Sequence, residues 1–314
     1  MSFREGRFFS IEKNFISGNS TTNKSDYQSF DFSEIPEKKL AEIWRETLEN
    51  GMHGICFSLY EDGQKPGDII TAEQVNRRIQ ILKPHTKWVR SFSCIEGNEH
   101  IPRIAKENGM QTLVGAWLGD DLELNEKEIE SLIALANEGC VDIAAVGNEV
   151  MYRGDLKEDQ LLDYINRVKQ AIPNIPVGYV DAYYEFSHRP RITEVCDVIL
   201  TNCYPYWEGC PIEYSLSHMQ SMFNSAKDAG KGKRVIITET GWPSEGGSLK
   251  GAVACNENAM KYFIETQNWS KSNDVEIFYF SSFDESWKVG PEGAVGAYWG
   301  LWDKNEKLKF NNKI

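Results

Sequence analysis

Short apolar runs alternate with amphipathic stretches along most of this chain. Eight runs are almost continuously apolar, and they cover residues 54–60, 87–93, 111–117, 142–146, 176–180, 197–203, 234–238 and 276–281. Such runs are typical of parallel strands covered on both faces by helices, whereas half-exposed strands alternate apolar and polar residues. The pattern therefore predicts eight buried parallel strands.

The amphipathic stretches between these runs predict the covering helices, at residues 71–82, 99–108, 125–138, 157–171, 215–229 and 252–266. Eight strand-and-helix units in a chain of 314 residues indicate an α/β fold, a single (β/α)8 TIM barrel. A doubly wound open sheet is the alternative. Such a sheet normally has a glycine-rich phosphate loop after its first strand, and residues 59–68 (LYEDGQKPGD) do not fit that pattern.

The first 33 residues differ from the rest, because they are polar and rich in Ser, Asn and Lys with scattered aromatic residues. We interpret residues 1–33 as an N-terminal arm and residues 34–314 as the barrel domain. The arm begins without the apolar stretch of a secretory signal, and no run of 18 apolar residues occurs in the chain. The sequence therefore predicts no insertion into a membrane.

The net charge of −13 and a pI near 5.0 disfavour nucleic acid and anionic membrane surfaces as partners. The five histidines show no HExxH or paired spacing, and no calcium loop is visible, so we expect neither a metal nor a cofactor. Seven cysteines without a CxxC motif indicate reduced, buried side chains, with one disulfide as the alternative.

Two glutamates follow apolar runs at the predicted carboxyl ends of strands, where the active site of a barrel forms. Glu149 follows the fourth run and Glu239 follows the seventh, so they lie on roughly opposite sides of the barrel mouth. Cleavage of a glycosidic bond needs such a pair. One carboxyl group protonates the leaving oxygen, and a second, about 5–5.5 Å away in retaining enzymes, attacks the anomeric carbon.

Four segments resemble glycoside hydrolase family 17, the β-1,3-glucanase family: VGNEV, TETGWPS, NCYPY and FDESWK. The resemblance extends over nearly all of residues 53–310. It implies that Glu149 is the acid/base and Glu239 the nucleophile of a retaining mechanism.

The resemblance also implies supporting roles in the site for Arg90, Tyr204 and the pair Glu285 and Lys288. The chain departs from plant members of the family after Lys288. Their acidic residue four positions before the last GL pair is replaced by Gly296, and Glu292 is the candidate to serve instead.

Aromatic residues in the same loops support a sugar site, because pyranose faces stack on indole and phenol rings. We expect Tyr206, Trp207 and Trp242 to contact substrate, and Asn148 to bind a sugar hydroxyl beside the reacting carbon. Some of these residues have structural alternatives: Trp242, Tyr204 and Tyr206 as core packing, and Glu285 with Lys288 as an ion pair.

The sequence thus predicts a monomeric enzyme that hydrolyses β-1,3-glucan such as laminarin in endo mode. A β-glucan transferase with the same covalent intermediate is the main alternative, and a barrel that binds glucan without cleaving it is a further one. A polymeric substrate favours a secreted or periplasmic location, although no export signal is visible in this chain.

Overall fold

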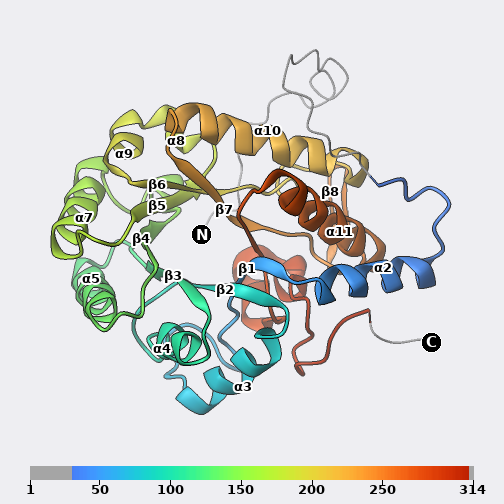
Figure 1. The fold of residues 1–314 in the computed structure, drawn as a ribbon, viewed down its shortest axis with the longest axis horizontal. Helices are drawn as coiled ribbons and strands as arrows, with labels where there is room; N and C mark the ends of the chain where they lie inside the picture. Colours follow the sequence, from blue (N-terminus) through green and yellow to red (C-terminus); the bar gives the residue numbers. More distant parts are fainter. Residues whose placement is uncertain (1–29, 311–314) are drawn as a thin grey trace.

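The computed structural model describes residues 30–310, and in it eight parallel strands close into a barrel surrounded by helices (Figure 1). The order around the barrel is β1-β10-β7-β6-β5-β4-β3-β2. The strands are β1 Met52–Cys56, β2 Thr86–Ser91, β3 Gln111–Ala116, β4 Ile143–Asn148, β5 Val177–Ala182, β6 Val198–Asn202, β7 Arg234–Thr240 and β10 Ile277–Tyr279. The predicted (β/α)8 TIM barrel is confirmed.

Each strand lies within one of the predicted apolar runs or overlaps it. All six residues of β4 and all five of β6 are buried, because helices cover the outside of the barrel and side chains fill its inside. The first strand starts earlier than predicted, at Met52, and ends at Cys56. Residues 57–60 therefore belong to the loop that reaches the mouth of the barrel.

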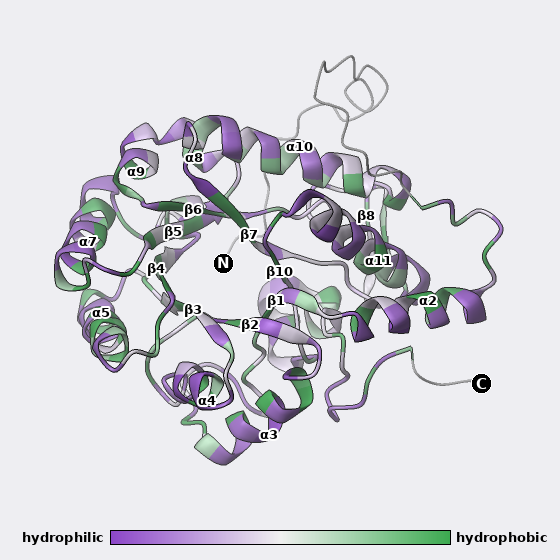
Figure 2. Cartoon of the chain, in the orientation of Figure 1, coloured by the Kyte–Doolittle hydropathy of each residue, from purple (hydrophilic) through white to green (hydrophobic). Residues whose placement is uncertain are grey.

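Helices connect the strands on the outside, and Figure 2 shows that they carry both hydrophobic and hydrophilic residues. The longer helices are α2 Glu37–Glu49, α3 Ala72–Leu82, α4 His100–Glu107, α5 Leu122–Asn137, α7 Glu158–Ala171, α10 Ile212–Gly230 and α11 Asn256–Asn273. The short ones are α6 Val150–Arg153, α8 Glu185–His188, α9 Pro190–Val195, α12 Val289–Glu292, and the 3-10 turns η1 Ser286–Lys288 and η2 Ala294–Tyr298.

The start of the predicted helix at 252–266 is wrong. Residues there form an antiparallel hairpin of β8 Gly247–Leu249 and β9 Ala252–Ala254, and α11 begins only at Asn256. Gly246 and Gly247 both have positive φ, which a glycine adopts at little cost, and they turn the chain into this hairpin. The hairpin adds a small flap to the loop after β7.

The predicted arm falls mostly on residues 1–29, which lie outside the described residues. Its last part lies against α11, because the Phe30 N–H donates to Glu265 Oε1 at 2.6 Å and Lys261 Nζ lies 5.7 Å from the Phe32 ring centre. Helix α2 follows and packs on the same helix α11 (Figure 1), with Trp44 and Phe263 ring centres 5.7 Å apart. The domain boundary at residue 33 stays a prediction.

All seven cysteines are free thiols in the structure, and only Cys255 is not fully buried. Burial is the main reason why the pKa of Cys56 is raised to about 12. The interpretation of the cysteines as reduced, packed side chains therefore agrees with the fold. Within residues 30–310, the helices are too short or too polar to cross a lipid bilayer.

Closure of the barrel between β1 and β10 depends on Gly54, which pairs with Phe278. A Cβ atom on Gly54 would lie 2.6 Å from the buried Phe278 ring. We predict that Gly54→Ala lowers the free energy of unfolding by about 1–3 kcal/mol, as overpacking does elsewhere. Thermal denaturation measures this loss.

Two further variants control for other effects of the substitution. Gly119→Ala adds the same methyl group where no atom lies within 4 Å, so we expect its melting temperature to be unchanged. The double variant Gly54→Ala with Phe278→Leu should regain part of the loss. A Gly54→Ala protein as stable as the wild type would refute this account of the closure.

Candidate active site

The two predicted catalytic glutamates meet at one side chain, Asn202 at the end of β6. Its Nδ2 donates to Oε1 of Glu149 and to Oε1 of Glu239, each at 3.0 Å. The two carboxylate oxygens are therefore no more than twice this distance apart. Such a spacing is close to the roughly 5–5.5 Å of retaining glycosidases and shorter than the roughly 6.5–9.5 Å of inverting ones.

Thr238 fixes the orientation of this amide. Its hydroxyl donates to Oδ1 of Asn202 at 2.9 Å, so the amide nitrogen must point toward the carboxylates. Thr238 is fully buried and lies on β7 one residue before Glu239. The hydroxyl therefore acts on the site only through Asn202.

Arg90 at the end of β2 is the cation of the site. It donates from Nη1 to Glu239 Oε1 and from Nη2 to Asn148 Oδ1, both at 2.8 Å. Burial opposes the charge of Arg90, which is 1% exposed, but the adjacent Glu239 carboxylate and Cys56 sulfur together raise the pKa of Arg90. Arg90 therefore stays charged and holds Glu239 and Asn148 in place.

Tyr204 completes the shell around Glu239. Its hydroxyl donates to Oε2 at 2.8 Å, while Oε1 accepts from Arg90 and Asn202. Phe280 and Trp299 pack edge-on against the Tyr204 ring. Donors on both oxygens hold this carboxylate in one orientation, as a nucleophile requires.

Glu149 has a different environment from Glu239. Glu239 is 5% exposed, whereas Glu149 is only partly buried. A general acid that later acts as a base must reach both the leaving group and the incoming water. The more open position of Glu149 suits that role, and the locked position of Glu239 suits attack on carbon.

A second charged group lies after β10. Lys288 Nζ is 2.6 Å from Glu285 Oε2 and 4.4 Å from the centre of the Phe280 ring. Burial opposes the charge of Lys288, but the carboxylates of Glu285, Glu292 and Glu239 raise its pKa. The structure thus places the predicted residues Glu285, Lys288 and Glu292 together and close to Glu239.

The predicted aromatic contacts form one packed cluster beside the site. Trp242 is buried and donates from Nε1 to the Val253 carbonyl at 2.9 Å, and its ring packs on Tyr206. Trp207 is only partly buried, and its ring centre lies 5.5 Å from that of Trp299. The structure shows packing for Trp242 and Tyr206, and contact of all three with substrate stays a prediction.

Sequence reasoning missed three residues of this face. Asn202 and Thr238 lie in the segments NCYPY and TETGWPS, which were noted for Tyr204 and Glu239. The signal that could have found them is a polar residue near the carboxyl end of an apolar strand. Trp117, at the carboxyl end of β3, is 39% exposed, and the Arg153 guanidinium lies 4.6 Å from its ring centre. Its exposed indole adds an aromatic surface at the rim of the barrel mouth.

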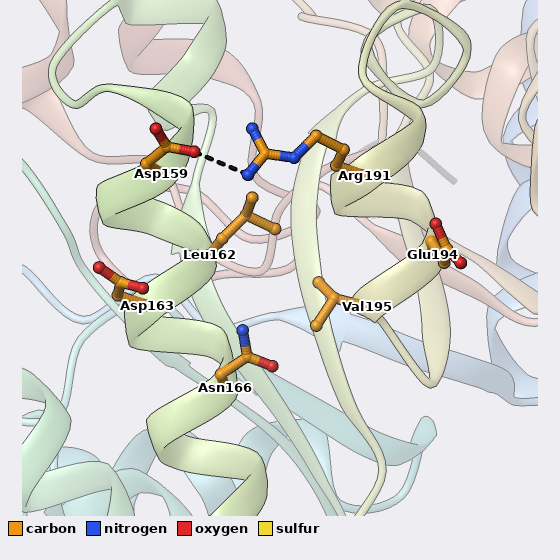
Figure 3. A pocket seen from close by; sticks show the side chains of 7 residues that line it. All are labelled: Asp159, Leu162, Asp163, Asn166, Arg191, Glu194 and Val195. Carbon is orange, nitrogen blue, oxygen red and sulfur yellow. Dashed lines mark hydrogen bonds and ion pairs between the residues drawn. The ribbon is translucent and has the colours of Figure 1, made fainter.

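A pocket of about 480 Å³ lies between α7 and α9, and Figure 3 shows the ion pair of Asp159 with Arg191 at its edge. It contains none of the strand-end residues described above. Within residues 30–310, no group of three or more His, Cys, Asp or Glu side chains could hold a metal ion.

A family model described as the BtgE/BtgC glycoside hydrolase domain matches residues 54–300 of this chain. The chain belongs to this family. The prediction of an enzyme that acts on glycosidic bonds is therefore confirmed. The matched residues include every strand-end segment that carries the site.

Similar proteins come from fungi. A glucan 1,3-beta-glucosidase of Arthroderma benhamiae is 31% identical over 73% of this chain and 81% of its own length. A glucan 1,3-beta-glucosidase of Saccharomyces cerevisiae is 26% identical over 74% of this chain and 82% of its own length.

Solved structures give the same picture of the fold. A glycoside hydrolase family 17 beta-1,3-glucanosyltransferase from Rhizomucor miehei superimposes with a TM-score of 0.75 at 29% identity, over 83% of this chain and 96% of that one. A Bacteroides uniformis beta-glucuronidase, with a TM-score of 0.63 at 14% identity over 82% of this chain and 34% of that one, is similar in fold alone.

The buried hydroxyl of Thr238 gives a test of the shared amide. We predict that Thr238→Val lowers kcat for glycoside hydrolysis about tenfold, because one hydrogen bond is worth roughly 1–1.5 kcal/mol. Steady-state kinetics measure this change. Thr238→Ser keeps the hydroxyl and should keep most of the activity.

The matched control is Thr201→Val on the neighbouring strand. Thr201 is equally buried, and its hydroxyl contacts Cys203 Sγ at 3.9 Å instead of a residue of the site. We expect its kcat to match the wild type. Equal losses in Thr238→Val and Thr201→Val would contradict the orienting role of Thr238.

Proposed function

We propose that this protein is a retaining enzyme of glycoside hydrolase family 17 that cleaves β-1,3-linked glucan, with Glu149 as acid/base and Glu239 as nucleophile. The observation that carries the proposal is the single Asn202 amide bonded to both carboxylates at 3.0 Å. It supports a short separation of the two groups and hence net retention at the anomeric carbon.

The reaction follows from the two environments. Glu239, held by Arg90, Asn202 and Tyr204, attacks the anomeric carbon while Glu149 gives its proton to the departing glycosidic oxygen. A covalent glycosyl-enzyme forms on Glu239. Glu149, now ionised, takes a proton from the incoming water, which attacks the same carbon and releases the sugar with its original configuration.

The substrate class rests on the relatives and on the shape of the rim. The curated relatives named above are glucan 1,3-beta-glucosidases, and the similar Rhizomucor structure is named for β-1,3-glucan chemistry. Trp117 is 39% exposed and Trp207 is partly buried, so both indole rings offer an aromatic surface to pyranose rings. We propose that the enzyme acts as a monomer. We also propose that it acts outside the cytoplasm, because its proposed substrate is a polymer.

Transfer of the glycosyl group to a second sugar is the other candidate. It shares the covalent intermediate with hydrolysis and differs only in whether water or a sugar hydroxyl attacks it. The specific observation in its favour is the similarity to a β-1,3-glucanosyltransferase at 29% identity.

The test is to follow the reaction of the purified protein on laminaripentaose by proton NMR and oligosaccharide profiling. We predict that the first new reducing ends are β-anomers and that products are shorter than the substrate. Products longer than laminaripentaose would establish the transferase. First-formed α-anomers would refute the retaining mechanism, and Glu239→Gln is the control that should form no product.

A further inference from the structure

The chain leaves β4 through a strained turn that ends at the acid/base. Gly147 has a φ of 88° and Glu149 a φ of 52°, and the short helix α6 starts at the next residue. A left-handed conformation is costly for a residue with a Cβ atom, and it persists only where the surroundings hold it. The position of the Glu149 carboxyl group therefore depends on what holds this turn.

Two side chains of β5 accept hydrogen bonds from backbone N–H groups in the first turn of α6. Tyr179 Oη accepts from the Met151 N–H at 2.8 Å, and Asp181 Oδ2 accepts from the Tyr152 N–H at 3.3 Å. The first N–H groups of a helix have no partner within the helix. Between them, the Val180 carbonyl accepts from the Glu149 N–H at 2.8 Å, so three consecutive residues of β5 hold the turn.

Tyr179 and Asp181 act as one unit. The Tyr179 hydroxyl donates to Asp181 Oδ2, and Oδ1 accepts from the Ala182 N–H at 2.7 Å. Both side chains are almost wholly buried, at 1% and 0% exposure. A movement of Asp181 would therefore be transmitted through Tyr179 and the helix turn to Glu149.

Asp181 is also coupled to Glu149 by charge. Burial raises the pKa of Asp181 to about 8, and the negative charge of Glu149 contributes in the same direction, as does Glu185 to a smaller extent. The hydrogen bond from Tyr179 opposes this shift, and the positive charge of Arg153 faces Tyr179. Asp181 therefore keeps its proton at neutral pH, and it acts on Glu149 there through its hydrogen bonds.

We propose that Asp181, together with Tyr179, is a positioning residue that holds Glu149 for its proton transfers. The proposal rests on the proposed role of Glu149 as acid/base. The mechanism above does not use Asp181, which touches neither the nucleophile nor the residues that hold it.

Asp181→Asn tests this directly, because the amide keeps the shape of the side chain but has one acceptor oxygen for the donors that Asp181 binds with two. We expect kcat to fall about 10- to 100-fold on laminaripentaose and less on an aryl β-laminaribioside with a good leaving group, which needs little protonation.

Two variants separate positioning from stability. Tyr179→Phe removes the hydroxyl that binds both the Met151 N–H and Asp181, so kcat should again fall more on laminaripentaose than on the aryl substrate. Asp142→Asn is the matched control: Asp142 lies at the opposite end of the barrel and pairs with Lys106 at 2.8 Å, so its loss should affect only stability. An Asp181→Asn enzyme with a wild-type kcat on laminaripentaose, or with equal losses on both substrates, overturns the proposal.

Tyr179→Phe applies even if Asp181→Asn does not fold. Equal losses of this variant on both substrates also overturn the proposal. A Glu149→Gln enzyme equally impaired on both substrates would instead refute the role of Glu149 on which the proposal rests.

Discussion

The site depends on one amide that two carboxyl groups share. Asn202 can bond to Glu149 and Glu239 only because the ends of β4, β6 and β7 converge at the same level of a closed barrel. Asn202 pairs with Glu239 across the ladder, after a shift of register that brings the two side chains level. The geometry of the barrel thus sets the distance between the two groups, and that distance determines the stereochemistry.

Burial of a nucleophilic carboxylate needs compensating charge nearby. Arg90 supplies it through a direct bond of 2.8 Å, and Lys288 adds a second buried cation whose raised pKa depends in part on Glu239. Neutral donors from Tyr204 and Asn202 occupy the remaining positions. Because these partners already bind both carboxylate oxygens, the proposed attack by Glu239 would need little reorganisation.

The sequence predicted the barrel, the two glutamates and Arg90, because apolar runs and strand-end motifs are local signals. The partners of these residues are not local. Asn202 and Glu239 come together because of the register of β6 and β7. The prediction of a helix from residue 252 missed the hairpin, whose Val253 carbonyl accepts a hydrogen bond from Trp242. Asp181 directly follows the predicted apolar run at residues 176–180. Nothing in the sequence shows that its carboxyl group accepts a hydrogen bond from the first turn of α6.

Azide rescue of two truncated variants tests the assignment of Glu149 and Glu239 most directly. With an activated aryl β-laminaribioside, Glu149→Ala should still form the glycosyl-enzyme, and azide should release a glycosyl azide of β configuration. Glu239→Ala has no nucleophile, so azide should attack the substrate from that side and give the α-azide. An α-azide from Glu149→Ala, or a β-azide from Glu239→Ala, would contradict the roles assigned to these two glutamates.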